Sequence, residues 1–360
     1  MRKIALIWLV LCSLLTVAAR AEDFGLEAQM EPPTARAVTL PGLVSSEPVE
    51  YAEAQPEAVR NNEIAFQIAS FLCQTGDRWP NNYAAAYSSS DKMRKSGTLI
   101  GVAGAKTWQF YEPIHAWSDV SQRASMPNIV KIQGEFSQGN MDYDSYVTGK
   151  KKSFDVKELD LRLLAGYAIA LNDRTLVTPY VGIGYRSSSN NAGGYVDYFV
   201  YDYAKFTVKN NLYYLPIGVE TLTRLNAQWD VGLNLEADWV IGGDVDYYLN
   251  EIDGLFPMVD VNTGEALQVQ TRKASSHLNG GFGFRTSVKL IRKFEKINFF
   301  VEPYLKFWSL NKSKPTEAHA YAVNNGKDYV SVYPDKNIYK PLWEADTYTI
   351  YTGLRMGVQF

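Results

Sequence analysis

Hydrophobic and polar positions alternate strictly near the C-terminal end of this chain. Every second residue from Phe360 back to Tyr348 belongs to one set, whose other members are aliphatic or weakly polar. The positions between them hold Gln359, Arg355 and glycines. Because successive side chains of a β-strand point to opposite faces, residues 348–360 predict a strand with one apolar and one polar face. A transmembrane barrel strand has this repeat, with the apolar face towards lipid.

The same alternation recurs upstream and predicts ten antiparallel strands. In chain order they span residues 63–73, 97–110, 129–141, 156–171, 175–186, 211–224, 229–241, 278–290, 297–310 and 348–360. An up-and-down barrel with both ends on one side needs an even number of strands. Eight strands, starting at residue 129, satisfy this rule as well. Residues 63–73 also fit an amphipathic helix, because Ile64, Ile68, Phe71 and Leu72 share a helical face.

The connections between these strands alternate between short and long. Residues 171–174, 225–228 and 291–297 form the short set, and residues 142–155, 187–206, 242–277 and 311–346 form the long set. Membrane barrels carry short periplasmic turns and long extracellular loops, so we expect the long set outside. The connection 111–128 is the exception, since it is long and falls on the periplasmic side.

The first sixty residues differ from the rest. Residues 1–21 have a basic start, an apolar stretch and a small-x-small end at Ala19 and Ala21, which predicts a secretory signal peptide. Residues 22–60 are rich in proline, glutamate and alanine and lack a lasting period, so we expect a disordered periplasmic tail. A plug folded back into the barrel is the alternative. Residues 61–360 are then the barrel.

Composition supports export and a barrel. Hydrophobic residues make up 46% of the chain, but no run after the signal peptide reaches the roughly 18 residues of a membrane helix. Tyrosine is abundant, 24 residues against 16 phenylalanines, as interfacial aromatic girdles require. The net charge of −3 and the lack of a basic patch or motif argue against nucleic-acid binding.

Charged residues of both signs fall on the polar faces of the predicted strands. The main set is Glu158, Arg162, Glu236, Asp238, Arg285, Lys289, Glu302, Lys306 and Arg355, with Lys131, Glu135, Asp160, Glu220 and Arg224 beside it. A barrel of about eight strands is narrow enough for side chains to fill, and an unpaired buried charge is costly. We therefore predict a lumen filled by ion pairs. A small polar pore or proton path is the alternative.

Specific pairs follow from the order of the strands. We expect Glu302 to lie between Arg285 and Arg355. We expect Glu236 or Asp238 to lie beside Arg285 and Lys289.

The predicted outer loops are acidic and rich in tyrosine. Their candidate binding residues are Asp142, Asp144, Tyr198, Asp202, Asp244 and Asp246. Loops on a rigid scaffold commonly carry function, and this composition suits a cation, a basic peptide or a glycan. The alternative is a tyrosine girdle with solvated carboxylates that face lipopolysaccharide.

Several segments carry a resemblance to known proteins. VTPYVGIGYR (177–186), YLPIGVET (214–221), VEPYLKFW (301–308) and QGEFSQGNMDYDSY (133–146) resemble a group of largely uncharacterised Gram-negative outer-membrane β-barrel proteins. The likeness spans roughly residues 96–360 and implies an all-β, transmembrane barrel in the bacterial outer membrane. Tyr348 and Phe360 frame a strand that resembles the C-terminal assembly signal of such barrels, which implies the barrel assembly machinery as a partner.

In size the chain is also similar to the omptin proteases and the OpcA-type adhesins. An omptin-like site needs two acidic groups facing an Asp–His pair that activates water. Asp142 and Asp144 match the first pair, whereas His277 has no aspartate beside it in the sequence. We therefore expect no enzymatic activity, and the sequence indicates no cofactor and no metal cluster.

These observations favour a non-enzymatic surface protein for adhesion, ligand binding or envelope integrity. Its expected partners are outer-membrane lipid and lipopolysaccharide, the assembly machinery, and a host or surface ligand. A narrow channel and, less favoured, an omptin-like surface protease are the alternatives.

Overall fold

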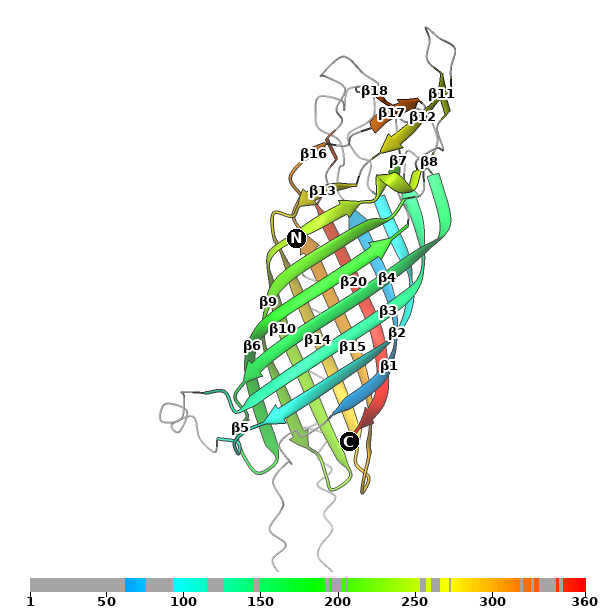
Figure 1. Cartoon of the computed structure of the whole chain (residues 1–360). Helices are drawn as coiled ribbons and strands as arrows, with labels where there is room; N and C mark the ends of the chain where they lie inside the picture. The colour runs from blue at the N-terminus through cyan, green and yellow to red at the C-terminus, as the bar shows by residue number, and fades with distance from the viewer. Residues whose placement is uncertain are drawn as a thin grey trace, which may run out of the picture. The chain divides into compact units, whose positions relative to one another are not determined.

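Ten long strands form a closed antiparallel β-barrel (Figure 1). The computed structural model describes residues 62–75, 93–114, 126–145, 149–191, 194–195, 203–204, 206–252, 257–259, 266–271, 273–317, 320–324, 327–329, 341–342 and 346–360. The barrel strands are β1 (Glu63–Thr75), β2 (Met93–Gln109), β3 (Ile129–Ser145), β4 (Gly149–Gly166), β6 (Thr175–Asn190), β9 (Val208–Arg224), β10 (Trp229–Tyr247), β14 (Gly281–Arg292), β15 (Asn298–Leu310) and β20 (Thr347–Gln359). The prediction of ten strands is confirmed. The predicted signal peptide and tail lie outside the described residues.

The first and last strands close the barrel. β1 pairs with β20 from Glu63 opposite Gln359 to Thr75 opposite Thr347, and it pairs with β2 on its other side. Two backbone hydrogen bonds of 3.0 and 3.1 Å between Asn62 and Phe360 continue this seam. The eight-strand and helical alternatives for residues 63–73 are therefore wrong, because neighbours on both sides hold this backbone extended.

The connections largely follow the predicted alternation. At one end, β9 and β10 are joined through residues 225–228, and β14 and β15 through residues 293–297. The described ends of the long connection 110–128, residues 110–114 and 126–128, also lie at this short-turn end. Its last residue, Asn128, accepts a 2.7 Å hydrogen bond from the amide of Ala168 beside β5 (Ile169–Ala170).

One predicted long loop is wrong. β3 and β4 extend to Ser145 and Gly149, so residues 146–148 alone join them where a loop over 142–155 was expected. The pairing continues past a bulge between Met141 and Tyr143. The strands run on because both side chains are buried inside the barrel, which gives the extension an inner face.

Two of the long connections are tied together at the other end. The segment between β10 and β14 contains η1 (Leu249–Ile252), β11 (Pro257–Val259), β12 (Ala266–Thr271) and β13 (Ala274–His277), and the segment between β15 and β20 contains β16 (Thr316–Glu317), β17 (Ala320–Asn324), β18 (Lys327–Tyr329) and β19 (Pro341–Leu342). β12 pairs with β17 from Gln268 opposite Val323 to Thr271 opposite Ala320. The four strands β11-β12-β17-β18 thus form one sheet, which we call the loop sheet. A shorter pair, β7 (Gly194–Tyr195) with β8 (Tyr203–Ala204), lies between β6 and β9.

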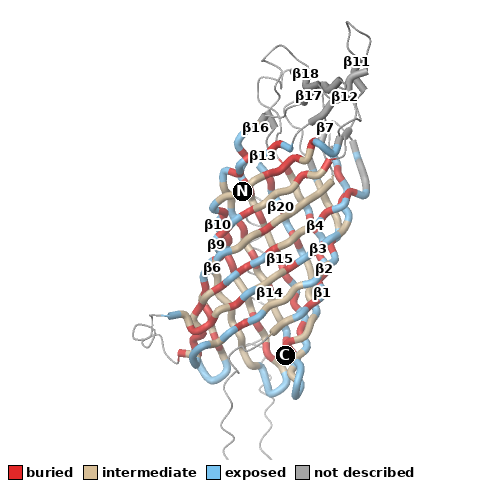
Figure 2. The backbone as a smooth tube through the Cα atoms, in the orientation of Figure 1, coloured by how far each residue is buried: buried red, intermediate tan, exposed pale blue. Residues whose placement is uncertain are grey.

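Burial alternates along parts of the barrel strands, for example over residues 212–217 of β9 and 347–352 of β20, and Figure 2 shows buried and exposed positions along the wall. The outer wall carries exposed apolar side chains, among them Ile64, Phe66, Ile68, Ile100, Val102, Ile132, Leu161, Leu163, Val181, Ile183, Leu215, Ile217, Trp239, Ile241, Phe282, Phe299, Val301 and Met356. The inner side holds buried charged side chains, among them Glu135, Asp160, Arg162, Glu236, Asp238, Arg285 and Glu302. Among the described residues, no helix is long and apolar enough to cross a membrane.

One glycine leaves room for a lumen tyrosine. A Cβ placed on Gly184 of β6 would overlap the ring of Tyr214, whereas a Cβ on Gly242 of β10 would meet nothing within 4 Å. We expect Gly184→Ala to lower the free energy of unfolding by about 1–3 kcal/mol, because the ring must shift in a packed interior. Gly242→Ala is the control, expected within about 0.5 kcal/mol of the parent protein. Urea titration of the barrel in lipid vesicles measures the free energy of unfolding of both variants. Equal stability of the two variants would contradict the close packing of Tyr214 against Gly184.

Candidate functional site

The barrel interior holds many paired charges, most of which are linked to one another. Among the described residues these pairs join the carboxylates of Glu63, Glu135, Glu158, Asp160, Glu220, Glu236, Asp238 and Glu302 to the cations of Lys131, Arg162, Arg186, Arg285, Lys289, Lys306 and Arg355. All of these side chains come from the inner faces of strands. We call them the lumen network.

Glu135 of β3 is the centre of one part of the network. Its Oε1 accepts a 2.6 Å hydrogen bond from Nη2 of Arg355 and a 3.5 Å one from Arg162, and its Oε2 accepts a bond from Lys306. Arg162 in turn donates from Nη1 to Glu236 at 2.6 Å. One carboxylate therefore binds cations from three other strands, which joins opposite parts of the wall.

Arg285 of β14 is the centre of a second part. Its Nε lies 2.7 Å from Asp238 and 3.1 Å from Glu236, and its Nη2 donates to Asp160 at 2.8 Å. The hydroxyl of Tyr214 donates to the other oxygen of Asp160 at 2.6 Å. All four charged groups are buried, so each loses hydration that contacts of this kind must replace.

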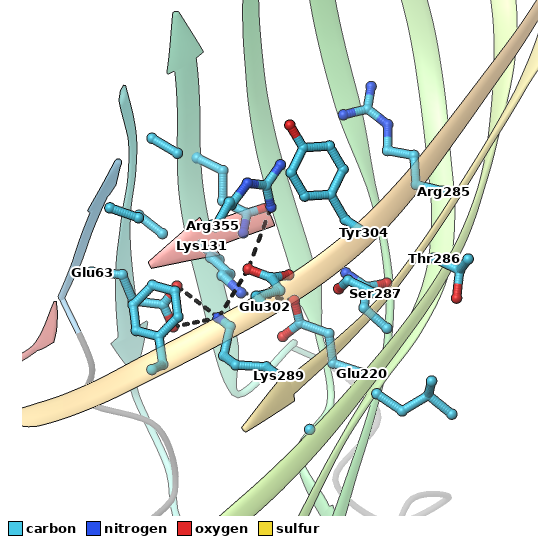
Figure 3. Close-up of a pocket in the computed structure, with 18 of the residues that line it drawn as sticks. Glu63, Lys131, Glu220, Arg285, Thr286, Ser287, Lys289, Glu302, Tyr304 and Arg355 are labelled. Atoms are coloured by element: carbon cyan, nitrogen blue, oxygen red, sulfur yellow. Dashed lines mark hydrogen bonds and ion pairs between the residues drawn. The ribbon is translucent and has the colours of Figure 1, made fainter. Parts of the chain in front are cut away.

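A cavity of about 110 Å³, lined in part by charged side chains, lies in the half of the lumen nearer the short-turn end. Figure 3 shows residues that line it. Lys289 lies 2.9 Å from Glu63 and 3.9 Å from Glu302 along its wall. Lys131 and Glu220 pair across it at 2.7 Å. The ammonium groups of Lys131 and Lys289 in this cavity therefore each have a carboxylate partner.

A second cavity of about 20 Å³ lies nearer the long-loop end. Glu135, Tyr304 and Lys306 line both cavities and so lie between them; we call these three residues the partition. The smaller space is about the size of one water molecule.

An apolar layer fills the lumen towards the long-loop end. It consists of Phe71, Leu99, Met141, Tyr143, Phe154, Val156, Phe206, Val208, Leu212, Tyr214, Val240, Val245, Tyr247, Leu249, Ala274, Leu278, Trp308, Leu310 and Tyr351. Trp308 meets Tyr214 edge to face at 5.2 Å. The guanidinium carbons of Arg186 and Arg285 lie 5.0 and 5.3 Å from its ring centroid. The apolar layer therefore rests directly on the lumen network.

The structure places all nine residues of the main predicted lumen set on inner faces, but some partners differ. Glu302 pairs with Arg355 at 3.5 Å and with Lys289, not with Arg285. Glu236 and Asp238 lie beside Arg285 as expected, but Lys289 binds Glu63 instead. Because the strands tilt, the inward-facing residues that meet across the barrel are offset along the strands. The alternation of polar and apolar residues in the sequence does not reveal this offset.

Sequence reasoning missed several members of the site. Arg186 pairs with Glu158 at 3.1 Å, and Glu63 was assigned only to the start of an uncertain strand. Tyr180 donates to Glu236 at 2.8 Å. The alternation along β6 and β9 could have identified these residues. The even-numbered residues of these strands face inward, and they include Arg186, Tyr180 and Tyr214.

The predicted acidic pair Asp142 and Asp144 lies on the outer side of β3. Both side chains are exposed, and the alternating neighbours Met141 and Tyr143 are buried. Asp142 accepts a 3.4 Å bond from the amide of Ser153, and Asp144 lies 3.9 Å from Lys150 in an exposed ion pair. The predicted Tyr198 and Asp202 fall outside the described residues.

An Asp–His pair exists where the sequence indicated none. β13 pairs with β10 so that His277 is opposite Asp244, and His277 Nδ1 contacts the carboxylate of Asp244. In the same ribbon, Ser275 donates to Asp246 at 2.6 Å. No aspartate is adjacent to His277 in the sequence, but a strand pairing brings Asp244 to it from 33 residues away, so the expectation that His277 has no aspartate partner is wrong. Asp142 and Asp144 are on β3, and β4, β6 and β9 stand between that strand and β10.

Asp246 also binds a lysine at this rim. Lys273 Nζ lies 3.0 Å from Asp246 and 5.0 Å from the ring centroid of Tyr248. The hydrogen bond from Lys273 to Asp246 raises the pKa of the lysine. Among the described residues, no group of three or more His, Cys, Asp or Glu side chains is placed to hold a metal ion.

Solved structures of barrel proteins are similar in fold. The outer membrane protease OmpT from Escherichia coli has 11% identity and a TM-score of 0.44, with 83% of this chain and 96% of that chain covered. The translocator domain of the autotransporter NalP from Neisseria meningitidis has 11% identity and a TM-score of 0.32, with coverages of 86% and 91%. A major outer membrane protein from Thermus thermophilus has 12% identity and a TM-score of 0.27, with coverages of 82% and 99%. No family model matches the chain, and no curated protein matches it. At these identities and scores the likeness does not extend to activity, substrate or partner, and the barrel assignment rests on the chain's own strand register.

The lumen network generates a stability prediction. Arg285→Met leaves Asp160, Asp238 and Glu236 with too few cations, so we expect the free energy of unfolding to fall by about 3–5 kcal/mol. Lys150→Gln is the control, because it breaks only the exposed pair with Asp144 and should cost at most about 0.5 kcal/mol. Urea unfolding of both variants in vesicles measures the difference. A parent-like stability of Arg285→Met would contradict the role given to Arg285.

Proposed function

We propose that this chain is an integral outer-membrane barrel with a closed lumen, whose long connections form a surface-binding region. In this arrangement the short-turn end faces the periplasm and the loop sheet faces outside. The role is non-enzymatic, in adhesion or ligand binding at the cell surface or in envelope integrity. The exposed apolar outer wall supports the membrane location, because water would make so much apolar surface costly.

The side chains that fill the interior are the observation that carries this proposal. The partition of Glu135, Tyr304 and Lys306 divides the interior, and the apolar layer around Trp308 lies beyond it. Open porins need about sixteen strands, far more than this barrel has. Transport through the lumen is thus the less favoured role, and the outer connections remain as the place for function.

The loop sheet supports a binding role at the surface. A partner that meets preformed strands loses less conformational entropy than one that must order a free loop. Backbone pairs from Gln268 to Thr271 on β12 hold two connections together, although the whole of β14 and β15 lies between β12 and β17 in sequence. The neighbouring ribbon adds the partly exposed carboxylate of Asp244, whose charge suits a basic peptide or a cationic surface.

A protease role is less favoured by the geometry. Asp142 and Asp144 lie on the outer side of β3, and Asp244 with His277 lies on the ribbon of β10 and β13. General acid–base chemistry on one substrate needs these groups within hydrogen-bond reach of the same reacting atoms. Their separation around the wall supports a non-enzymatic role.

Planar bilayer recording tests the closed lumen. We expect the parent protein to give no current steps, because buried charges and aromatic rings occupy the path. Trp308→Ala removes the largest side chain of the apolar layer, so we expect brief openings. Trp239→Ala, a matched change on the exposed outer wall, should remain silent. Stable current steps from the parent protein would favour the narrow channel instead.

A loop replacement tests surface binding. Residues 257–271 are exchanged for a glycine-serine linker of equal length, which removes β11 and β12 from the loop sheet. We expect cells that display this variant to lose binding to immobilised basic peptides and arrayed glycans, while the barrel keeps its heat-dependent shift in gel mobility. Replacing residues 225–228 at the opposite end is the control. Equal binding by both variants, or no binding by the parent protein, would contradict the surface role.

A further inference from the structure

A guanidinium lies among three aromatic rings on the outer wall at the short-turn end. Arg292, the last residue of β14, is in register with Trp229 of β10 and with Phe299 of β15. Its central carbon lies 5.2 Å from the ring centroid of Trp229 and 5.5 Å from that of Phe294. Phe294 meets Phe299 edge to face at 5.5 Å. We call these four residues the arginine cradle.

Arg292 differs from the arginines of the lumen in its partners. Arg162, Arg285 and Arg355 each bind carboxylates, whereas the contacts of Arg292 within the described chain are with aromatic rings. The adjacent Lys293 binds the buried Asp230 at 2.7 Å, so that acid is occupied. Cation–π contacts cover the faces of a guanidinium but leave its N–H donors at the edge. The cradle therefore offers hydrogen-bond donors and positive charge to an anion.

The cradle lies where the apolar wall ends. Leu290, two residues back along β14, and its neighbour Val301 on β15 are apolar and exposed. The turn beyond Arg292 contains the exposed Glu295 and Lys296. In a bilayer this boundary is the level of the lipid headgroups, where tryptophan and basic side chains concentrate.

We propose that the arginine cradle binds the phosphate group of a phospholipid in the periplasmic leaflet. A planar guanidinium can donate two parallel hydrogen bonds to two phosphate oxygens, which a point-charge ammonium cannot do. The three rings pack against the glycerol and upper acyl chain while they hold the guanidinium in place. This inference rests on the proposed membrane placement, with the short-turn end in the periplasm.

Native mass spectrometry of the purified full-length chain tests the site, with dioleoylphosphatidylglycerol as the probe and diacylglycerol as the phosphate-free comparison. We expect the parent protein to retain the phospholipid and not the diacylglycerol. Arg292→Gln should weaken retention about tenfold, the loss of a charge-assisted bidentate contact. Arg292→Lys keeps the charge and should fall between the two. Lys296→Gln removes a charge from the same turn without touching the rings, and should stay within about twofold of the parent protein.

The variants and the added phosphate distinguish a specific lipid site from a nonspecific charge effect and from a free-anion site. Unchanged retention by Arg292→Gln, or an equal loss in Lys296→Gln, would overturn the cradle as a specific site. Displacement of the lipid by inorganic phosphate at equal concentration would show a free-anion site and would also overturn the proposal. Gel mobility with and without heating shows whether each variant is folded, and Arg292→Lys tests the site even if Arg292→Gln misfolds. Failure of the parent barrel to insert into vesicles would instead count against the proposed membrane function.

Discussion

The cost of removing charges from water determines the arrangement inside this barrel. The lumen network brings eight carboxylates and seven cations into a narrow interior, where an isolated ion would lose several kcal/mol of hydration. Each group recovers that loss only where its partners reach it from other strands. Glu135, for example, binds cations from three strands, β4, β15 and β20. The pairing thus holds the barrel in one register and shape as well as filling its centre.

The apolar layer extends this constraint towards the long-loop end. Trp308 packs on Tyr214 and lies against the guanidinium groups of Arg186 and Arg285. The rings exclude water from these ion pairs, which strengthens their attraction, and the guanidinium groups give the rings a fixed surface to pack on. Breaking either part weakens the other. A closed lumen and a rigid wall are consequences of the same contacts, and the rigid wall in turn supports the loop sheet.

The strands were predictable because their period of two is local. Alternation placed Arg285, Glu302 and Arg355 on inner faces correctly, and it gave the order of the ten strands. Pairing partners were not predictable, since they depend on the tilt of strands: Lys289 meets Glu63, which is 226 residues away. The apolar layer was missed because Leu212 or Val240 gives the same pattern whether it faces lipid or a packed lumen. His277 met Asp244 through β13, a four-residue strand too short to give a period.

The positions of ordered water molecules test directly whether the lumen is closed. A crystal structure of the detergent-extracted barrel, at a resolution that shows waters, would locate them along the whole interior. If the lumen is closed, waters occupy the cavity lined by Lys131 and Lys289 and end at the partition of Glu135, Tyr304 and Lys306. A continuous file of waters that passes Trp308 to the long-loop end would contradict a closed lumen.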